Sequence, residues 1–191
     1  MKLDRILPFA RILLEKAVKP GDIAIDCTMG NGHDTVFLAN LTGPNGHVYS
    51  FDIQQSALLN TEERLLSNGL KEQVTLIHAG HERLQEYVRP DKPVTGAIFN
   101  LGYLPGGDKE IITTAPTTIQ AITQLLEIME PEGIIVLVIY HGHPGGDLER
   151  DELIKYVTEL PQDTAHVLEY RFMNQKNNPP FIIAIEKRKK V

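Results

Sequence analysis

The stretch Asp26-Cys-Thr-Met-Gly-Asn-Gly-His-Asp-Thr35 decides how the rest of the sequence is interpreted. It follows a short apolar run that begins at Ile23 and precedes a segment of helical periodicity that reaches Leu41. Glycines between a strand and a helix let the backbone approach a ligand closely, and the helix N-terminus that follows offers free N–H groups. The stretch therefore predicts a nucleotide-like ligand at the carboxyl end of a strand, although any tight turn in an open α/β sheet has a similar composition.

Apolar runs and segments of helical periodicity alternate on both sides of this loop. Short loops between alternating strands and helices imply right-handed crossovers and a mainly parallel sheet with helices on both faces. No helix separates the last two strands, so we expect them to pair antiparallel as a hairpin at one edge of a seven-stranded α/β sheet. The predicted helices cover residues 7–18, 33–41, 54–67, 81–88, 114–129 and 147–160, and the predicted strands cover 23–26, 47–52, 74–77, 96–99, 133–140, 165–172 and 181–186.

The composition predicts one domain over residues 1–191, with residues 1–20 as an N-terminal helix that packs on it or extends it. A single cysteine, Cys27, excludes an intramolecular disulfide framework and a multi-thiolate zinc site. The longest apolar run, residues 133–140, is far shorter than the roughly 20 residues that span a bilayer. Because charges also punctuate the first residues, where a signal peptide would be apolar, we expect a cytoplasmic protein without membrane contact.

The charge is unevenly distributed along an acidic chain of net charge −6. Residues 1–20 hold five basic and two acidic residues, and residues 171–191 hold six basic and one acidic residue. If both ends lay on one face, they would form a basic surface on an acidic protein. The alternative is that the run Lys187-Arg188-Lys189-Lys190 is a solvated tail.

Two acids end neighbouring predicted strands. Asp26, at the end of the first strand, suits a ligand that carries an ammonium group. Asp52 ends the second strand, 20 residues after Gly32, where an acid accepts hydrogen bonds from ribose hydroxyls; a helix N-cap is the alternative. Thr35 stands where the third glycine of the dinucleotide fingerprint would fall, which disfavours NAD.

These residues resemble the cofactor loop of class I methyltransferases that depend on S-adenosylmethionine (SAM), with Thr28 in place of the first glycine. Residues 100–108, 140–146 and 174–180 extend the resemblance to bacterial proteins once catalogued as rRNA methylases and now assigned as tRNA wobble-uridine methyltransferases, the MnmM or YtqB-like family. The resemblance implies a Rossmann-like fold and SAM as the cofactor. The residues expected to contact the cofactor are Asp26, Thr28, Met29, Gly30, Asn31, Gly32, His33, Asp34, Thr35, Asp52, Gln54, Gly80, His81, Asn100 and Leu101.

The methyl acceptor is expected beside Asn100-Leu-Gly-Tyr103, which resembles the Asn-Pro-Pro-Tyr segment of amino-methyltransferases. In that segment the Asn oxygen accepts a hydrogen bond from the target amine and the aromatic ring stacks on the base. Alternatively, Asn100 caps a turn and Tyr103 packs over the loop. The predicted catalytic residues are Asn100, Tyr103 and His141, and the predicted substrate-binding residues are Tyr103, Leu104, Pro105, His141, His143 and Asn177.

The spacing of His141 and His143 also suits a metal ion, but only loosely placed carboxylates such as Asp147 could complete the site, so no metal is predicted. The histidines are expected to contact substrate or to shape their loop.

The resemblance implies an N-methyltransferase that converts the 5-aminomethyl group of wobble (2-thio)uridine to 5-methylaminomethyl on the tRNA anticodon stem-loop. Direct transfer is expected, because the sole cysteine lies in the cofactor loop and not at the acceptor site. Methylation of rRNA or of a small molecule stays open as an alternative, as does a non-catalytic SAM-binding protein. A homodimer is expected because one small domain offers little surface for tRNA.

Overall fold

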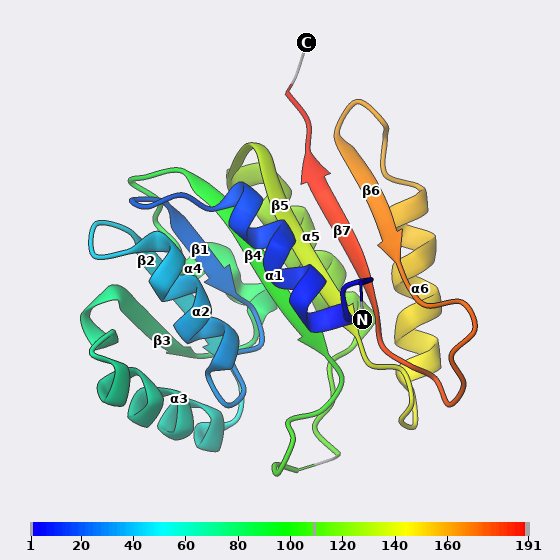
Figure 1. Ribbon diagram of the computed structural model, residues 1–191, viewed down its shortest axis with the longest axis horizontal. Coiled ribbons are helices and arrows are strands. Elements are labelled where there is room, and N and C mark those ends of the chain that lie inside the picture. Colours follow the sequence, from blue (N-terminus) through cyan, green and yellow to red (C-terminus); the bar gives the residue numbers. More distant parts are fainter. Residues whose placement is uncertain (1, 109, 190–191) are drawn as a thin grey trace.

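The computed structural model describes residues 2–108 and 110–189, and in these ranges a seven-stranded sheet lies between two layers of helices (Figure 1). The strands are ordered β3-β2-β1-β4-β5-β7-β6, and the first five of these are parallel. β7 pairs antiparallel with both β5 and β6, which confirms the predicted edge hairpin. The strand bounds are β1 Ile23–Asp26, β2 His47–Asp52, β3 Val74–His78, β4 Val94–Leu101, β5 Met129–Ile139, β6 Ala165–Tyr170 and β7 Phe181–Lys187.

The helices cover both faces of the sheet, as the alternating pattern predicts. Neighbouring residues of β4 show how the two apolar cores divide: Ile98 packs in one core with Leu38, and Phe99 packs in the other with Leu125. Successive strand residues point to opposite faces, so a continuous apolar strand serves both cores. On the first face are α1 Ile6–Ala17, α2 His33–Thr42 and α3 Gln55–Asn68, and on the second are α4 Leu84–Tyr87, α5 Ala115–Ile128 and α6 Gly146–Thr158.

Several predicted elements differ in their bounds from those observed; the strand predicted over residues 96–99, for example, is β4 Val94–Leu101. The helix predicted over residues 81–88 is a 3₁₀ turn, η2 His81–Arg83, followed by the single turn of α4, because Pro90 lies just beyond and cannot continue a helix. The fifth strand begins at Met129 rather than at residue 133, because its first residues pair with Val94 across a register shift. A further short helix, η1 Lys71–Gln73, leads into β3. At the carboxyl edge, β5 ends one residue before its predicted end and β4 two residues after it.

The two basic ends of the chain lie at opposite edges of the sheet (Figure 1). The start of α1 lies near the carboxyl edge of the parallel strands, where the Tyr170 hydroxyl at the end of β6 donates to the Asp4 carbonyl. The C-terminal run lies at the other edge, where Arg188 donates to the Gln162 carbonyl at 2.7 Å and Lys189 pairs with Glu132 at 3.5 Å. A basic surface shared by the first residues of the chain and the run from Lys187 to Lys189 is therefore wrong, whereas Arg171, directly after β6, lies on the side of the first residues; Lys190 lies outside the described residues.

None of the helices in the described ranges is both long and apolar enough to cross a membrane.

Candidate active site

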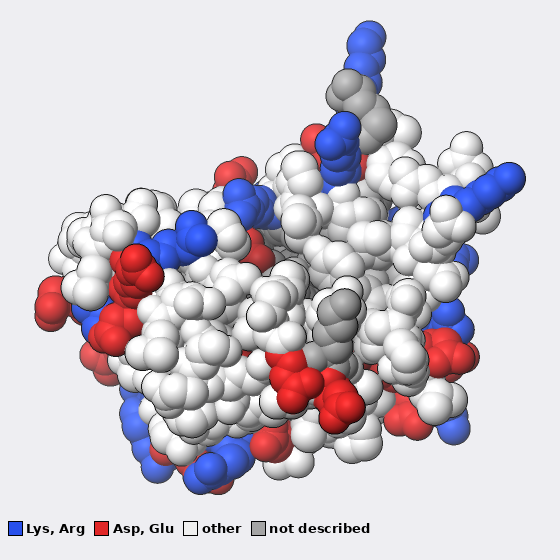
Figure 2. Space-filling view, turned by 90° about the horizontal axis from the view of Figure 1, so that it is seen from below, with Lys and Arg blue, Asp and Glu red and all other residues white. Residues whose placement is uncertain are grey.

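A cavity of about 870 Å³ opens at the carboxyl edge of the sheet. Its walls come from the segments that follow β1 to β5, together with the N-terminal half of α1. Figure 2 looks at the molecule from this side and shows a largely uncharged centre with charged side chains around its rim. This volume is in the range of pockets that enclose a cofactor or another small molecule.

The glycine loop after β1 forms the floor of the cavity. Gly30 has a φ of 50°, and its N–H donates to Asp52 at 3.0 Å. Gly32, at the N-cap of α2, has a φ of 78°, and a Cβ there would lie 2.9 Å from the Thr61 side chain. Glycine is the residue that readily adopts a positive φ, and it has no Cβ to meet Thr61. The loop can therefore hold its backbone close to whatever occupies the cavity. Gly32 itself lies behind the lining.

Asp52 lines the cavity at the end of β2, as expected of a ribose ligand. One of its oxygens accepts from the Gly30 N–H and the other from the Gln54 N–H at 2.9 Å. Each carboxylate oxygen has a second lone pair, so these bonds orient the group and leave acceptor capacity.

Asp26 and Thr35 do not line the cavity. Asp26 is fully buried at the end of β1, where it accepts hydrogen bonds from the Thr35 hydroxyl at 2.7 Å and the Thr28 N–H at 3.2 Å. Burial, followed by the nearby charge of Asp34, raises its pKa to about 7. The expected contact between Asp26 and an ammonium group stays a prediction, although the carboxylate does not line the cavity. The carboxylate that does face the cavity from this side is Asp34, two residues into α2.

His81 follows β3 and reaches the cavity from beneath. Its Nδ1 lies 2.9 Å from the Cys27 carbonyl, which can only accept, so Nδ1 carries the proton and Nε2 is an acceptor. Nε2 is buried without a partner among the described residues, and burial lowers the pKa of the ring. A buried, unpartnered acceptor in a cavity wall suits a ligand that brings a donor.

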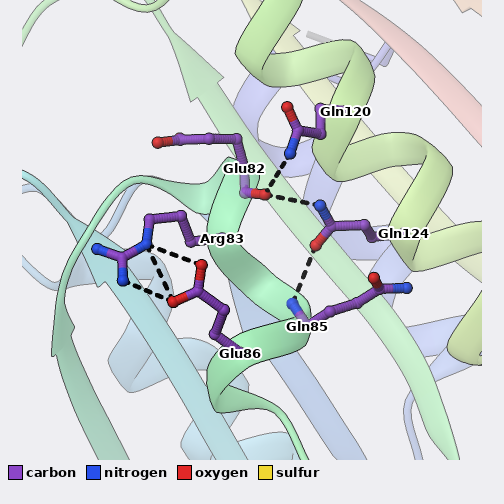
Figure 3. A network of polar contacts seen from close by, with 6 residues as sticks. All are labelled: Glu82, Arg83, Gln85, Glu86, Gln120 and Gln124. Carbon is purple, nitrogen blue, oxygen red and sulfur yellow. Dashed lines mark hydrogen bonds and ion pairs between the residues drawn. The ribbon is translucent and has the colours of Figure 1, made fainter.

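The segment that carries His81 is fastened to α5 (Figure 3). The side-chain amides of Gln120 and Gln124 both donate to the Glu82 carbonyl, and the Gln124 oxygen accepts from the Gln85 N–H. The Glu82 side chain points away from this network and folds over Gly80 in the cavity lining. Neither Glu82 nor its fastening was predicted; acids are too common after strands for sequence to mark this one.

Asn100 is the last residue but one of β4 and lines the cavity. Its N–H donates to the Thr28 hydroxyl at 2.7 Å, and its Nδ2 donates to Asp34 at 2.9 Å. No described residue donates to its Oδ1, which is not buried. An unused amide oxygen at the edge of a cavity can accept a hydrogen bond from a ligand amine.

The segment after Asn100 forms the outer wall. Tyr103 is 41% exposed and lies edge-on to the His143 ring, at 5.8 Å between centroids. Leu104 and Pro105 also line the cavity. The wall is tied to α6, because the Thr113 hydroxyl accepts from the Gly102 N–H and donates to the buried Glu149 at 2.8 Å.

The two histidines that follow β5, His141 and His143, differ in their relation to the cavity. His143 lines the cavity, whereas His141 does not. The Nδ1 of His141 lies 3.2 Å from Arg150 on α6, and burial followed by the Arg150 charge lowers its pKa. The predicted catalytic role of His141 is therefore not supported by its position. Among the described residues, no group of three or more potential ligands is placed to hold a metal ion.

Asn177 likewise lies outside the lining, and its neighbour Asn178 takes that place. Both have positive φ, 66° and 50°, so the loop between β6 and β7 turns tightly there.

Several lining residues were not predicted. α1 contributes Leu7 and Arg11, and Tyr140 lines the cavity directly after β5. The position of Tyr140 as the last residue of a predicted strand was a usable signal, whereas nothing in α1 marks which of its residues reach the site. The predicted residues that do line the cavity are Thr28, Met29, Gly30, Asn31, His33, Asp34, Asp52, Gln54, Gly80, His81, Asn100, Leu101, Tyr103, Leu104, Pro105 and His143.

SAM fits the groups that line this cavity. The glycine loop offers close backbone approach, Asp52 offers carboxylate oxygens for hydroxyl groups, and His81 offers an unpaired buried acceptor. The acids around the cavity suit a cationic ligand.

Comparisons with known proteins agree with this arrangement. Residues 48–186 match the sequence profile of a family described as putative rRNA methylase. The tRNA (mnm(5)s(2)U34)-methyltransferase of Arabidopsis thaliana, described as chloroplastic, is 34% identical over an alignment of 186 residues, and the match covers 93% of this chain and 68% of that protein.

Two crystal structures extend the comparison. A putative rRNA methylase from Clostridium thermocellum has 41% identity and a TM-score of 0.94, and the match covers 98% of this chain and 100% of that one. A putative methyltransferase from Streptococcus mutans, in complex with SAH, has 41% identity and a TM-score of 0.88, covering 97% and 99%.

Proposed function

The chain belongs to the putative rRNA methylase family and is a SAM-dependent methyltransferase, and we propose that its methyl acceptor is the 5-aminomethyl group of a wobble uridine in tRNA. The observation that carries the proposal is the open Oδ1 of Asn100 in the cavity wall. The name of the Arabidopsis relative supports the choice of nucleotide.

Asn100 would orient the amine for attack. An amide oxygen accepts a hydrogen bond from an N–H of the amine, and this bond directs the nitrogen lone pair away from Asn100. When bound, SAM supplies an electrophilic methyl group. Direct displacement depends on such alignment, and holding the nucleophile in place provides much of the rate.

The amine must be neutral when it reacts. An alkylamine has a lysine-like pKa near 10.4, so almost all of it is protonated at neutral pH. An amide oxygen can accept from the neutral amine as well as from the cation, and an ordered water is the simplest proton acceptor. His141 was a further candidate, but it does not line the cavity.

The base itself would lie against Tyr103. Unstacked RNA bases are commonly held on aromatic rings, and this ring is 41% exposed at the outer wall. The largely uncharged centre of the face in Figure 2 suits a base, and the Lys and Arg side chains among the charges around it suit the RNA backbone.

The wobble position, the anticodon stem-loop as the recognised part of tRNA, a homodimer and a cytoplasmic location are all parts of this proposal. The second candidate is an rRNA acceptor, which the description of the family favours.

Mass spectrometry of wobble nucleosides tests the proposal in cells. Cells that lack the protein should accumulate 5-aminomethyl-2-thiouridine and lose its methylated form, and the wild-type gene should reverse both changes. An unchanged nucleoside profile in tRNA, with a methylation lost from rRNA instead, would favour the second candidate.

RNA affinity should depend on Lys2 and Arg5 and not on the C-terminal basic run. Lys2 and Arg5 precede α1, whose Leu7 and Arg11 line the cavity, whereas Arg188 and Lys189 lie at the opposite edge. Each phosphate contact on single-stranded RNA contributes about −0.7 to the slope of the logarithm of the binding constant against the logarithm of the salt concentration. The double variant Lys2→Gln/Arg5→Gln should therefore flatten the slope by about 1.4 in titrations at several salt concentrations. Arg188→Gln/Lys189→Gln is the control of equal charge change, and a slope lowered by the control alone would place the RNA at the other edge.

A further inference from the structure

The amide of Asn100 has a fixed orientation in the structure. Its Nδ2 donates to an oxygen of Asp34 at 2.9 Å, and a carboxylate can only accept hydrogen bonds. The amide group that faces Asp34 is therefore the NH₂, and Oδ1 faces the other way. A flipped amide would bring two oxygens together, so the carboxylate selects one of the two orientations.

Asp34 is itself held from a second side. Its other oxygen lies 3.3 Å from the guanidinium of Arg11 on α1, and this guanidinium lies 5.0 Å from the centre of the Phe37 ring. The Asp34 side chain is only 14% exposed, in the first turn of α2, where the helix N-terminus favours a negative charge. Arg11, Asp34 and Asn100 thus form a chain of contacts from α1 to the centre of the site.

We propose that Asp34 is a positioning residue that keeps the Asn100 amide oxygen directed at the methyl acceptor, with Arg11 holding Asp34. This inference rests on the proposed function, since it assumes that an acceptor amine is recognised by that oxygen. It differs from the sequence-based expectation that Asp34 contacts the cofactor. An amide without Asp34 could turn its NH₂ toward the amine, which would then meet a donor instead of an acceptor.

Kinetics of Asp34 variants separate the two roles. Asp34→Ala should lower kcat by roughly tenfold to 100-fold, as expected for a misaligned nucleophile, and should leave the Kd for SAH within about twofold. Asp34→Asn should not recover the lost kcat, because its single oxygen accepts from the Arg11 guanidinium and its NH₂ then faces Asn100, whose oxygen turns toward it and away from the methyl acceptor. The control is Asp147→Ala, which removes an acid from the first turn of α6 without touching Asn100. A variant that loses SAH affinity by more than about tenfold while keeping kcat would overturn the proposal, because Asp34 would then hold the cofactor.

A double-mutant cycle tests whether Asp34 acts through Asn100. In the Asn100→Ala background, Asp34→Ala should have no further effect on kcat. Losses that multiply would mean that the two residues act independently and would contradict the proposal.

A measurement without RNA keeps this inference separate from the proposed function. In NMR spectra of the apo protein, the side-chain NH₂ resonances of Asn100 should shift when Asp34 is replaced by alanine, and not when Asp147 is. If that shift is seen but no aminomethyluridine is methylated, the proposed function fails and the orienting contact stands. If Asn100 does not respond, the positioning role fails whatever the substrate.

Discussion

Replacing Asn100 by alanine should lower kcat by about 10²- to 10³-fold, the range found when one polar group that acts in the transition state is removed. The Kd for SAH should change by no more than about twofold, because an alignment contact contributes mainly to the transition state. The backbone of residue 100 stays anchored, since its N–H bonds to the Thr28 hydroxyl and this bond does not use the side chain.

The measurement is a steady-state methylation assay together with calorimetry of SAH binding. Asn40→Ala is the matched control, because Asn40 is exposed on α2 and its side chain bonds only to the Val36 carbonyl. Wild-type turnover by the Asn100 variant would remove this residue from the acceptor site and would leave Tyr103 as the group to test next.

Asp26→Asn should make the folded protein more stable at pH 8 and change it little near pH 4. Burial holds the pKa of Asp26 at about 7 in the folded protein, against 3.8 for an exposed group. Between these values the folded state binds more protons than the unfolded state, so the contribution of Asp26 to stability is present below pH 4 and is lost as the pH rises to 7. The rise of the Asp26 pKa from 3.8 to about 7 lowers the free energy of unfolding above pH 7 by about 4 kcal/mol, as an order of magnitude.

Denaturant titrations of wild type and variant at pH 4, 6 and 8 measure this difference. Asparagine can keep both hydrogen bonds, because its oxygen can accept from Thr28 and its NH₂ can donate to the Thr35 hydroxyl. The exposed Asp163 provides the control Asp163→Asn. A variant that is equally or less stable at pH 8 would mean that Asp26 is not held in an unfavourable ionised state. SAH titration of the same variant tests the predicted contact of Asp26 with the cofactor.

The strand ends could be predicted from sequence because each one coincides with a change of composition. Apolar runs stop at Asp26, Asp52 and Asn100, and parallel strands bring such ends to one edge. The order of the last two strands in the sheet was less accessible. An antiparallel pair was expected, but no local pattern shows that β7 inserts between β5 and β6.

Which side chains point into the cavity could not be predicted from the sequence, because residues one or two positions apart in a loop point in different directions. His143 lines the cavity and His141 does not, and Asn178 lines it where Asn177 was expected. Asp26 is turned to Thr35, so its carboxylate lies behind the cavity wall. These choices depend on contacts from α2, α6 and the β6–β7 loop, which are distant in sequence.

The contribution of α1 was also out of reach. Its apolar face predicted a helix that packs on the domain or extends it, and in the structure Ala10 and Leu14 lie in the apolar core of the first sheet face. Arg11 reaches the site only because α1 crosses the sheet beside α2, near Asp34 and Phe37. The position of the C-terminal basic run also depends on the tertiary structure. β7 runs antiparallel to β5 and therefore places this run at the opposite edge.

The most direct test of the central claim compares two anticodon stem-loops that differ in a single group. One carries 5-aminomethyluridine at the wobble position and the other carries plain uridine, and methyl transfer to each is followed with labelled SAM and nucleoside mass spectrometry. The proposed chemistry predicts methylation of the first RNA on the amine nitrogen and no detectable transfer to the second, because plain uridine offers no amine to Asn100. Equal methylation of both RNAs, or transfer to neither while rRNA is methylated, would contradict the account.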